Sequence, residues 1–153
     1  HDETLKLIRR GHTAADFTAA WRILKERGLK CAAHLIFGLP GEGMTEIQET
    51  IRFLNPLEPD GIKIHNLVIP QGTVLASQYL AGEIVPPCAR RHVEYCISAI
   101  ERLRKETVVM RLTCDVPKNS VAAPLSFWKK GMIYDTVRRE MALRNTWQGK
   151  FLE

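Results

Sequence analysis

The stretch HLIFGLPGEG, residues 34–43, changes character after its fourth residue. Positions 35–37 are apolar, and two glycines, a proline and Glu42 follow directly. Glycine allows the backbone to turn sharply, and a carboxylate is favourable near the N-terminus of a following helix. The stretch therefore predicts the carboxyl end of a β-strand and a turn into a helix. It is neither a P-loop, because no GK[ST] follows, nor a dinucleotide-binding GxGxxG fingerprint.

Strands and helices are expected to alternate on both sides of this stretch. Strands are predicted over 30–37, 61–69 and 107–115, and amphipathic helices over 13–28, near 45–54 and over 88–106. The first helix ends at Gly28, and Thr45 with Gln48 predicts a capping box for the second. This order is typical of βαβ units, and therefore of a parallel sheet with helices packed outside.

Each expected strand has one apolar and one more polar face, because successive side chains point to opposite sides. The apolar faces carry Ala33, Leu35, Phe37, Ile62, Ile64, Val68, Val108, Met110, Leu112 and Cys114, with Asn66 as an exception. The opposite faces carry His34, Lys63, His65, Arg111, Thr113 and Asp115. A doubly wound sheet, which is covered on both faces, favours continuously apolar strands, so the pattern predicts a barrel with a polar interior.

Three strands are too few for a complete barrel, which takes about 250 residues. The fold class predicted is α/β: the later half of a partial TIM-type barrel, with about three parallel strands, outer helices and a C-terminal helical extension. We assign residues 1–116 to the half-barrel and 117–153 to an extension that packs on it. The chain begins at His1 rather than methionine, which we interpret as a piece of a longer protein. An isolated half-barrel exposes two sheet edges and its inner face, so we expect it to form a homo-oligomer, to lack order in places, or to belong to a larger structure.

The composition is that of an ordinary globular domain, with 45% apolar and 25% charged residues among 153. No apolar run approaches the roughly 20 residues that span a bilayer, and no signal peptide is present, so we expect a cytoplasmic protein without membrane contact. The formal charge of +5 is spread over several amphipathic segments, which favours solvated helix faces over nucleic-acid binding.

The four cysteines have spacings that match neither zinc-binding CxxC pairs nor a disulfide framework. We expect reduced and mostly buried thiols at Cys31, Cys88, Cys96 and Cys114.

HLIFGLPGE resembles the GxIxGxxE segment on a late barrel strand of radical S-adenosylmethionine (SAM) enzymes, with His34 where the first glycine would stand. Further segments resemble, in order, the YhcC-like branch of that family, whose relatives include the Elongator catalytic subunit and oxygen-independent coproporphyrinogen oxidase. They are HDETLKLIRRGH, RGLKCAAHLIFGLPGEG, DGIKIHNLVIPQGTVLA, RLTCDVP, APLSFWKKG and TWQGKF. The resemblance covers essentially the whole chain.

The resemblance implies an oxidoreductase barrel that binds SAM beside a 4Fe-4S cluster and forms a 5′-deoxyadenosyl radical for hydrogen abstraction. By position, Ile36 and Gly38 would shape the adenine pocket, and Glu42 would hold the turn or reach the nucleoside. The stretch from His65 through Leu67 to Val68 would face the adenine. The residues Lys63, Arg111 and Asp115 would project into the barrel, where they either contact substrate or form an internal charge network.

The sequence departs from the family at the cluster, whose ligands form a CxxxCxxC loop, since no two cysteines have that spacing. No metal ligand is therefore assigned, and the chain alone is expected to be inactive. The function predicted is that of a fragment of a radical SAM enzyme with an unknown small-molecule or RNA-linked substrate. Two alternatives stay open: a non-catalytic RNA-binding module and a self-dimerising α/β module.

Overall fold

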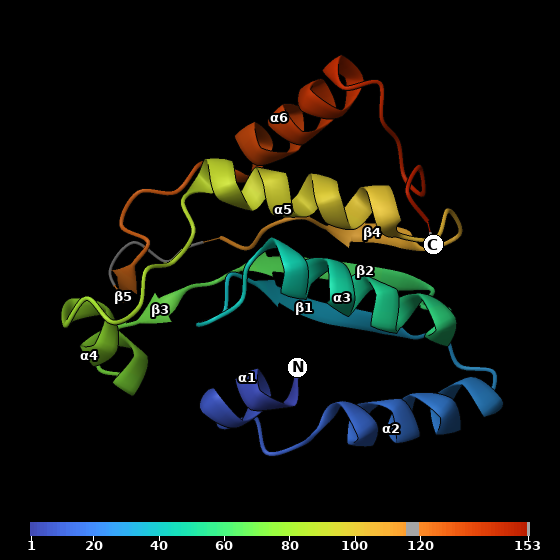
Figure 1. Ribbon diagram of the computed structural model, residues 1–153, viewed down its shortest axis with the longest axis horizontal. Helices are drawn as coiled ribbons and strands as arrows, with labels where there is room; N and C mark the ends of the chain where they lie inside the picture. Colours follow the sequence, from blue (N-terminus) through green and yellow to red (C-terminus); the bar gives the residue numbers. More distant parts are fainter. Residues whose placement is uncertain (116–119, 153) are drawn as a thin grey trace.

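A three-stranded parallel sheet lies at the centre of the computed structural model, which describes residues 1–115 and 120–152. Its strands are β1 (Ala32–Phe37), β2 (Gly61–Asn66) and β4 (Val108–Arg111), in the order β1-β2-β4. Both neighbouring pairs are parallel, and Figure 1 shows helices between the strands along the chain. The prediction of an α/β fold with three parallel strands and outer helices is confirmed.

Helices precede, connect and follow the strands along the chain. They are α1 (Asp2–Leu7), α2 (Ala14–Glu26), α3 (Met44–Leu54), the 3₁₀ turn η1 (Asn55–Leu57), α4 (Val74–Leu80), α5 (Ala89–Arg102) and α6 (Lys130–Leu143). The main core joins side chains of α2, α3, α5 and α6 to the apolar faces of β1 and β2, where Ala33, Phe37, Ile62 and Ile64 are buried. Trp21 of α2 is buried there, and its indole N–H donates to the Leu57 carbonyl at 2.9 Å.

The first turns of α2 and α3 are stabilised in different ways. Thr13 caps α2: its hydroxyl accepts from the Asp16 N–H at 3.1 Å, and the Asp16 carboxylate accepts from the Thr13 N–H at 2.8 Å. The capping box predicted at Thr45 is wrong, because α3 is capped two residues earlier. Its N-cap is Gly43, whose N–H donates to the Glu46 carboxylate at 2.7 Å.

Replacing Thr13 by alanine is expected to lower the free energy of unfolding by about 1 kcal/mol, the usual cost of losing an N-cap. Thr45→Ala is the matched control, because Thr45 is exposed inside α3 and caps nothing. Urea denaturation followed by circular dichroism measures both variants. Equal stability of the two variants would contradict the role given to Thr13.

A bulge in β4 changes which side chains face the core. The register is Gly61 with Val108 and Ile62 with Val109, but Lys63 pairs with Arg111, so Met110 is the extra residue. Val109 packs against the main core, whereas Val108 and Met110 are 60% and 51% exposed. The prediction that Val108 and Met110 face the helices is therefore wrong, because simple alternation fails across a bulge. Leu112 is buried in the core, as expected.

A second, two-stranded sheet lies at the carboxyl end of β2. Here β3 (Ile69–Pro70) pairs antiparallel with β5 (Val121–Ala123), and α4 packs beside them. The strand predicted over 61–69 is thus divided into β2 and β3, and the one predicted over 107–115 is shorter. After β5, α6 packs on α5. The domain boundary predicted at 116/117 lies outside the described residues.

None of the helices in residues 1–115 and 120–152 combines the length and the apolar character that crossing a bilayer requires.

Candidate functional site

The face of the sheet opposite the helices is open and carries a row of basic side chains. His34 pairs with Lys63 in the register of β1 and β2, and Lys63 pairs with Arg111 in the register of β2 and β4. The three therefore lie side by side across three strands, and the bulge at Met110 brings Arg111 into the row. His34 is exposed, while Lys63 and Arg111 are half-buried.

Ile36 and His65 are direct cross-strand neighbours. They lie two residues beyond His34 and Lys63, toward the carboxyl ends of β1 and β2. Ile36 is 44% exposed, and the His65 ring lies 5.7 Å from the His34 ring, centroid to centroid. The Nε2 atom of His65 is buried without a hydrogen-bond partner among the described residues. Burial lowers the pKa of His65, and the nearby charges of Arg111, His34 and Lys63 lower it further.

Gly38 and Glu42 line a different cavity at the rim of the sheet, with a volume of about 860 Å³. It lies between the β1–α3 turn and the start of α5, where Pro87 of the preceding segment and Arg91 and Tyr95 of α5 line it. The position of a Cβ on Gly38 would fall 2.3 Å from Cγ of Pro87, so proline takes the room that this glycine leaves. Partial burial raises the pKa of Glu42, against a hydrogen bond from Thr4 that lowers it.

The segment after β2 is held mainly by packing and by one amide side chain. Leu67 is buried in a second apolar cluster with Ile69, so only its backbone is available to a ligand, while Val68 is half-buried. Asn66, the exception on the apolar face, is buried at the end of β2. Its Oδ1 accepts from the Thr113 hydroxyl at 2.7 Å and from the Cys114 N–H at 3.1 Å, which fixes the segment after β4 beside β2.

Asp115 is separated from the basic row. It is exposed and lines a cavity of about 440 Å³ together with residues 121–130, including Trp128. The candidate residues thus fall into an open-face group (Ile36, Lys63, His65 and Arg111), a rim group (Gly38 and Glu42), the segment of Leu67 and Val68, and Asp115 alone. His34, Lys63 and Arg111 were predicted on the polar faces of their strands, but their alignment in one row depends on strand register, which local sequence patterns do not give.

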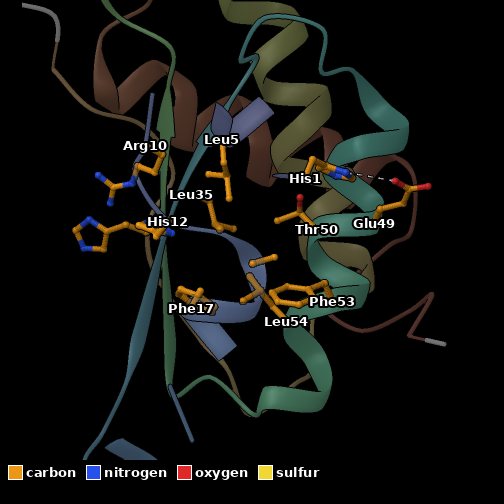
Figure 2. A pocket seen from close by; sticks show the side chains of 12 residues that line it. His1, Leu5, Arg10, His12, Phe17, Leu35, Glu49, Thr50, Phe53 and Leu54 are labelled. Carbon is orange, nitrogen blue, oxygen red and sulfur yellow. Dashed lines mark ion pairs between the residues drawn. The ribbon is translucent and has the colours of Figure 1, made fainter. Parts of the chain in front are cut away.

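A third cavity, of about 470 Å³, lies beside the unpaired edge of β1 (Figure 2). Phe17 of α2 and Phe53 of α3 meet across it with ring centroids 6.3 Å apart, next to Leu35. The ring of His12 points away from these apolar side chains. The cavity is mainly apolar, and β1 has a strand neighbour on one side only within the described chain.

The described residues contain no group of three His, Cys, Asp or Glu side chains that could hold a metal ion. All four cysteines are free thiols; Cys31 and Cys96 are buried, but Cys88 is exposed. Burial raises the pKa of the Cys96 and Cys114 thiols, which disfavours the thiolates that ligate iron. A 4Fe-4S cluster therefore does not fit the described residues of this chain.

The open face fits part of a nucleoside better. It offers an apolar side chain at Ile36 and a buried ring nitrogen at His65 that has no hydrogen-bond partner among the described residues. An aromatic base with polar edges would use both features.

Parallel strands with helices on one face and a polar, open face on the other define part of an α/β barrel of the TIM type. Residues 59–142 match the Radical_SAM C-terminal domain, and residues 1–54 match the Radical SAM superfamily. The chain belongs to the radical SAM superfamily.

Two relatives and one solved structure give the similarity in detail. YhcC of Escherichia coli K12 is 34% identical over 128 residues, which cover 82% of this chain and 40% of that protein. A tRNA uridine(34) acetyltransferase of Methanocaldococcus infernus is 32% identical over 120 residues, covering 76% of this chain and 22% of that enzyme. The structure of M. infernus Elp3 lacking its N-terminus matches with a TM-score of 0.84 and 28% identity, over 97% of this chain and 35% of that one. The chain thus spans less than half the length of each. The resemblance to the YhcC-like and Elongator-related branch is confirmed.

Proposed function

We propose that this chain is the adenosyl-binding half of a radical SAM enzyme, in which Ile36, His65 and the backbone after β2 face the adenine of SAM. Bound beside a cluster held by another part of the protein, SAM would supply the 5′-deoxyadenosyl radical that abstracts hydrogen from a substrate. The chain's own residues would position the nucleoside and shield it from water. The observation that carries the proposal is the Ile36–His65 pair at the carboxyl ends of two parallel strands.

The edge of β1 supports a continuation of the sheet. It is unpaired within the described residues, and the apolar cavity beside it is bounded by Phe17, Leu35 and Phe53. A further parallel strand from a preceding part of the protein would pair with this edge and fill that cavity. The relatives, which are more than twice as long as the matched segment, are consistent with this arrangement.

The proposal is tested with the protein made from the complete reading frame that contains this sequence, reconstituted anaerobically with iron and sulfide. With SAM and dithionite we expect 5′-deoxyadenosine, detected by chromatography. The 153-residue chain under the same conditions is expected to form none. Absence of 5′-deoxyadenosine from the complete protein would overturn the proposal.

The role of Ile36 is tested by Ile36→Asp, which we expect to lower 5′-deoxyadenosine formation at least tenfold, because a carboxylate replaces the apolar contact with the base. Val108→Asp is the matched control. Val108 is an apolar side chain on the same face, 60% exposed, but it lies at the amino ends of the strands. Equal losses in both variants would show that Ile36 does not contact the nucleoside.

A further inference from the structure

We propose that the row His34–Lys63–Arg111 binds an oxyanion of the substrate, a phosphate or a carboxylate; this inference rests on the proposed function and adds the substrate class. The row lies on the open face, one side-chain repeat, about 6 to 7 Å, nearer the amino ends than the Ile36–His65 pair. A substrate that reaches the nucleoside from within the barrel would meet the row first.

The arrangement of the row is costly for the fold unless an anion is bound. Like charges directly opposite each other on neighbouring strands are destabilising. In the described part of the chain neither Lys63 nor Arg111 forms an ion pair, although the chain's other arginines and lysines form several. The carboxylate nearest to Lys63 in sequence, Asp60, pairs with Lys25 at 3.1 Å. The one nearest to Arg111, Asp115, is exposed and lines the separate cavity toward residues 121–130.

The chemistry of the row suits an oxyanion. A guanidinium presents paired N–H donors that match the two oxygens of a carboxylate or phosphate, and an ammonium adds a mobile charge beside it. His34 and His65 complete the lining, with their rings 5.7 Å apart, and the Nε2 atom of His65 has no hydrogen-bond partner in the part of the chain that the structure describes. Burial lowers the pKa of His65, and the charges of Arg111, His34 and Lys63 lower it further.

The bulge in β4 supports the same assignment. With regular pairing, Lys63 would face Met110 across the strands, and Arg111 would point to the helix side. The extra residue places Arg111 opposite Lys63 instead. Bulges frequently re-aim a side chain beside a binding site, so a bulge that adds a second charge to the row is consistent with ligand binding.

The test uses the 153-residue chain and its histidines as reporters in nuclear magnetic resonance spectra of the imidazole groups. Sodium pyrophosphate is titrated at constant ionic strength and pH 6.5, and succinate in a second series separates phosphate from carboxylate recognition. We expect saturable shifts of the His34 and His65 resonances with one or both anions. His12, which lines the cavity at the edge of β1 together with His34 and Arg10, reports anion binding at that edge rather than at the row. Buried His92 reports the integrity of the fold.

The double variant Lys63→Met/Arg111→Met is expected to weaken anion binding at least tenfold. The matched control Lys105→Met/Arg138→Met removes two positive charges from exposed side chains away from the open face, and it is expected to change the affinity less than twofold. If the double variant fails to fold, as judged by His92, the single variant Lys63→Met provides the test. No shift of His34 and His65, or equal weakening in the variant and its control, would overturn the inference. This assay needs neither SAM nor a cluster, so its outcome is independent of 5′-deoxyadenosine formation.

Discussion

Gly38→Ala is expected to lower the free energy of unfolding by about 2 to 5 kcal/mol. Gly38 has a φ of +86°, where a residue with a Cβ is strained by about 1 to 2 kcal/mol. The new methyl group would also fall 2.3 and 2.5 Å from Cγ and Cδ of Pro87, and such overpacking costs about 1 to 3 kcal/mol more. Urea denaturation of the variant and the wild type measures the difference.

Gly41→Ala separates the two contributions, because Gly41 has a φ of +81° but no atom within 4 Å of its Cβ position. The free energy of unfolding of Gly41→Ala should therefore fall only by the cost of the backbone strain. Adding Pro87→Ala to Gly38→Ala should restore part of the lost stability, since the clashing ring atoms are removed. If Gly38→Ala and Gly41→Ala lose the same stability, Pro87 does not restrict this turn.

Lowering the pH from 6.5 to 4 is expected to cost the fold roughly 3 kcal/mol through His92 alone, at 1.36 kcal/mol per pKa unit. His92 is fully buried, and burial lowers its pKa from 6.5 to about 4, although its hydrogen bond to the Leu112 carbonyl opposes this. Nε2 lies 2.7 Å from that carbonyl, which only accepts, so Nε2 carries the proton of the neutral ring.

The sign follows from proton uptake. Between pH 6.5 and 4 the unfolded chain protonates His92 and the folded chain does not, so acid favours unfolding in this window. Above pH 6.5 the stabilisation is fully present, and it is lost as the pH falls toward 4.

His92→Gln removes the titrating group and keeps a neutral donor, so the pH dependence of its unfolding free energy should be flatter than that of the wild type. His12→Gln, at an exposed position, should retain the wild-type dependence. Urea titrations at several pH values between 4 and 7 provide the comparison. An unchanged slope in His92→Gln would contradict the assignment.

The amphipathic patterns allowed the α/β order to be predicted, because burial alternates along β1 and recurs at helical spacing along α3. Lys63 and His65 were expected on the polar face and lie there. The prediction failed where a pairing partner decides the geometry: the bulge in β4 depends on its register with β2, and the α3 cap depends on Glu46 reaching back to Gly43. His92 was missed because a histidine within a helix gives no sign of burial on its own.

The sequence allowed the candidate site residues to be named, but not which of them lie together. The family resemblance assigned Gly38 to the adenine pocket, yet the ring of Pro87, 49 residues further along the chain, fills the space beside Gly38. Asp115 was grouped with Lys63 and Arg111 by strand alternation, which does not extend past the end of β4 at Arg111. Contacts between distant segments, rather than local pattern, determine these positions.

The bulge at Met110 in β4 also makes the side-chain sizes at positions 61 and 110 depend on each other. Met110 leans over Gly61, so a Cβ on residue 61 would meet Sδ of Met110 at 2.8 Å and the Val108 carbonyl oxygen at 3.2 Å. Among homologous chains that keep the bulge, a long side chain at position 110 should therefore occur with glycine at 61, and a larger residue at 61 with a shorter one at 110. Paired variation of these two positions would mark which relatives share this distortion of the sheet.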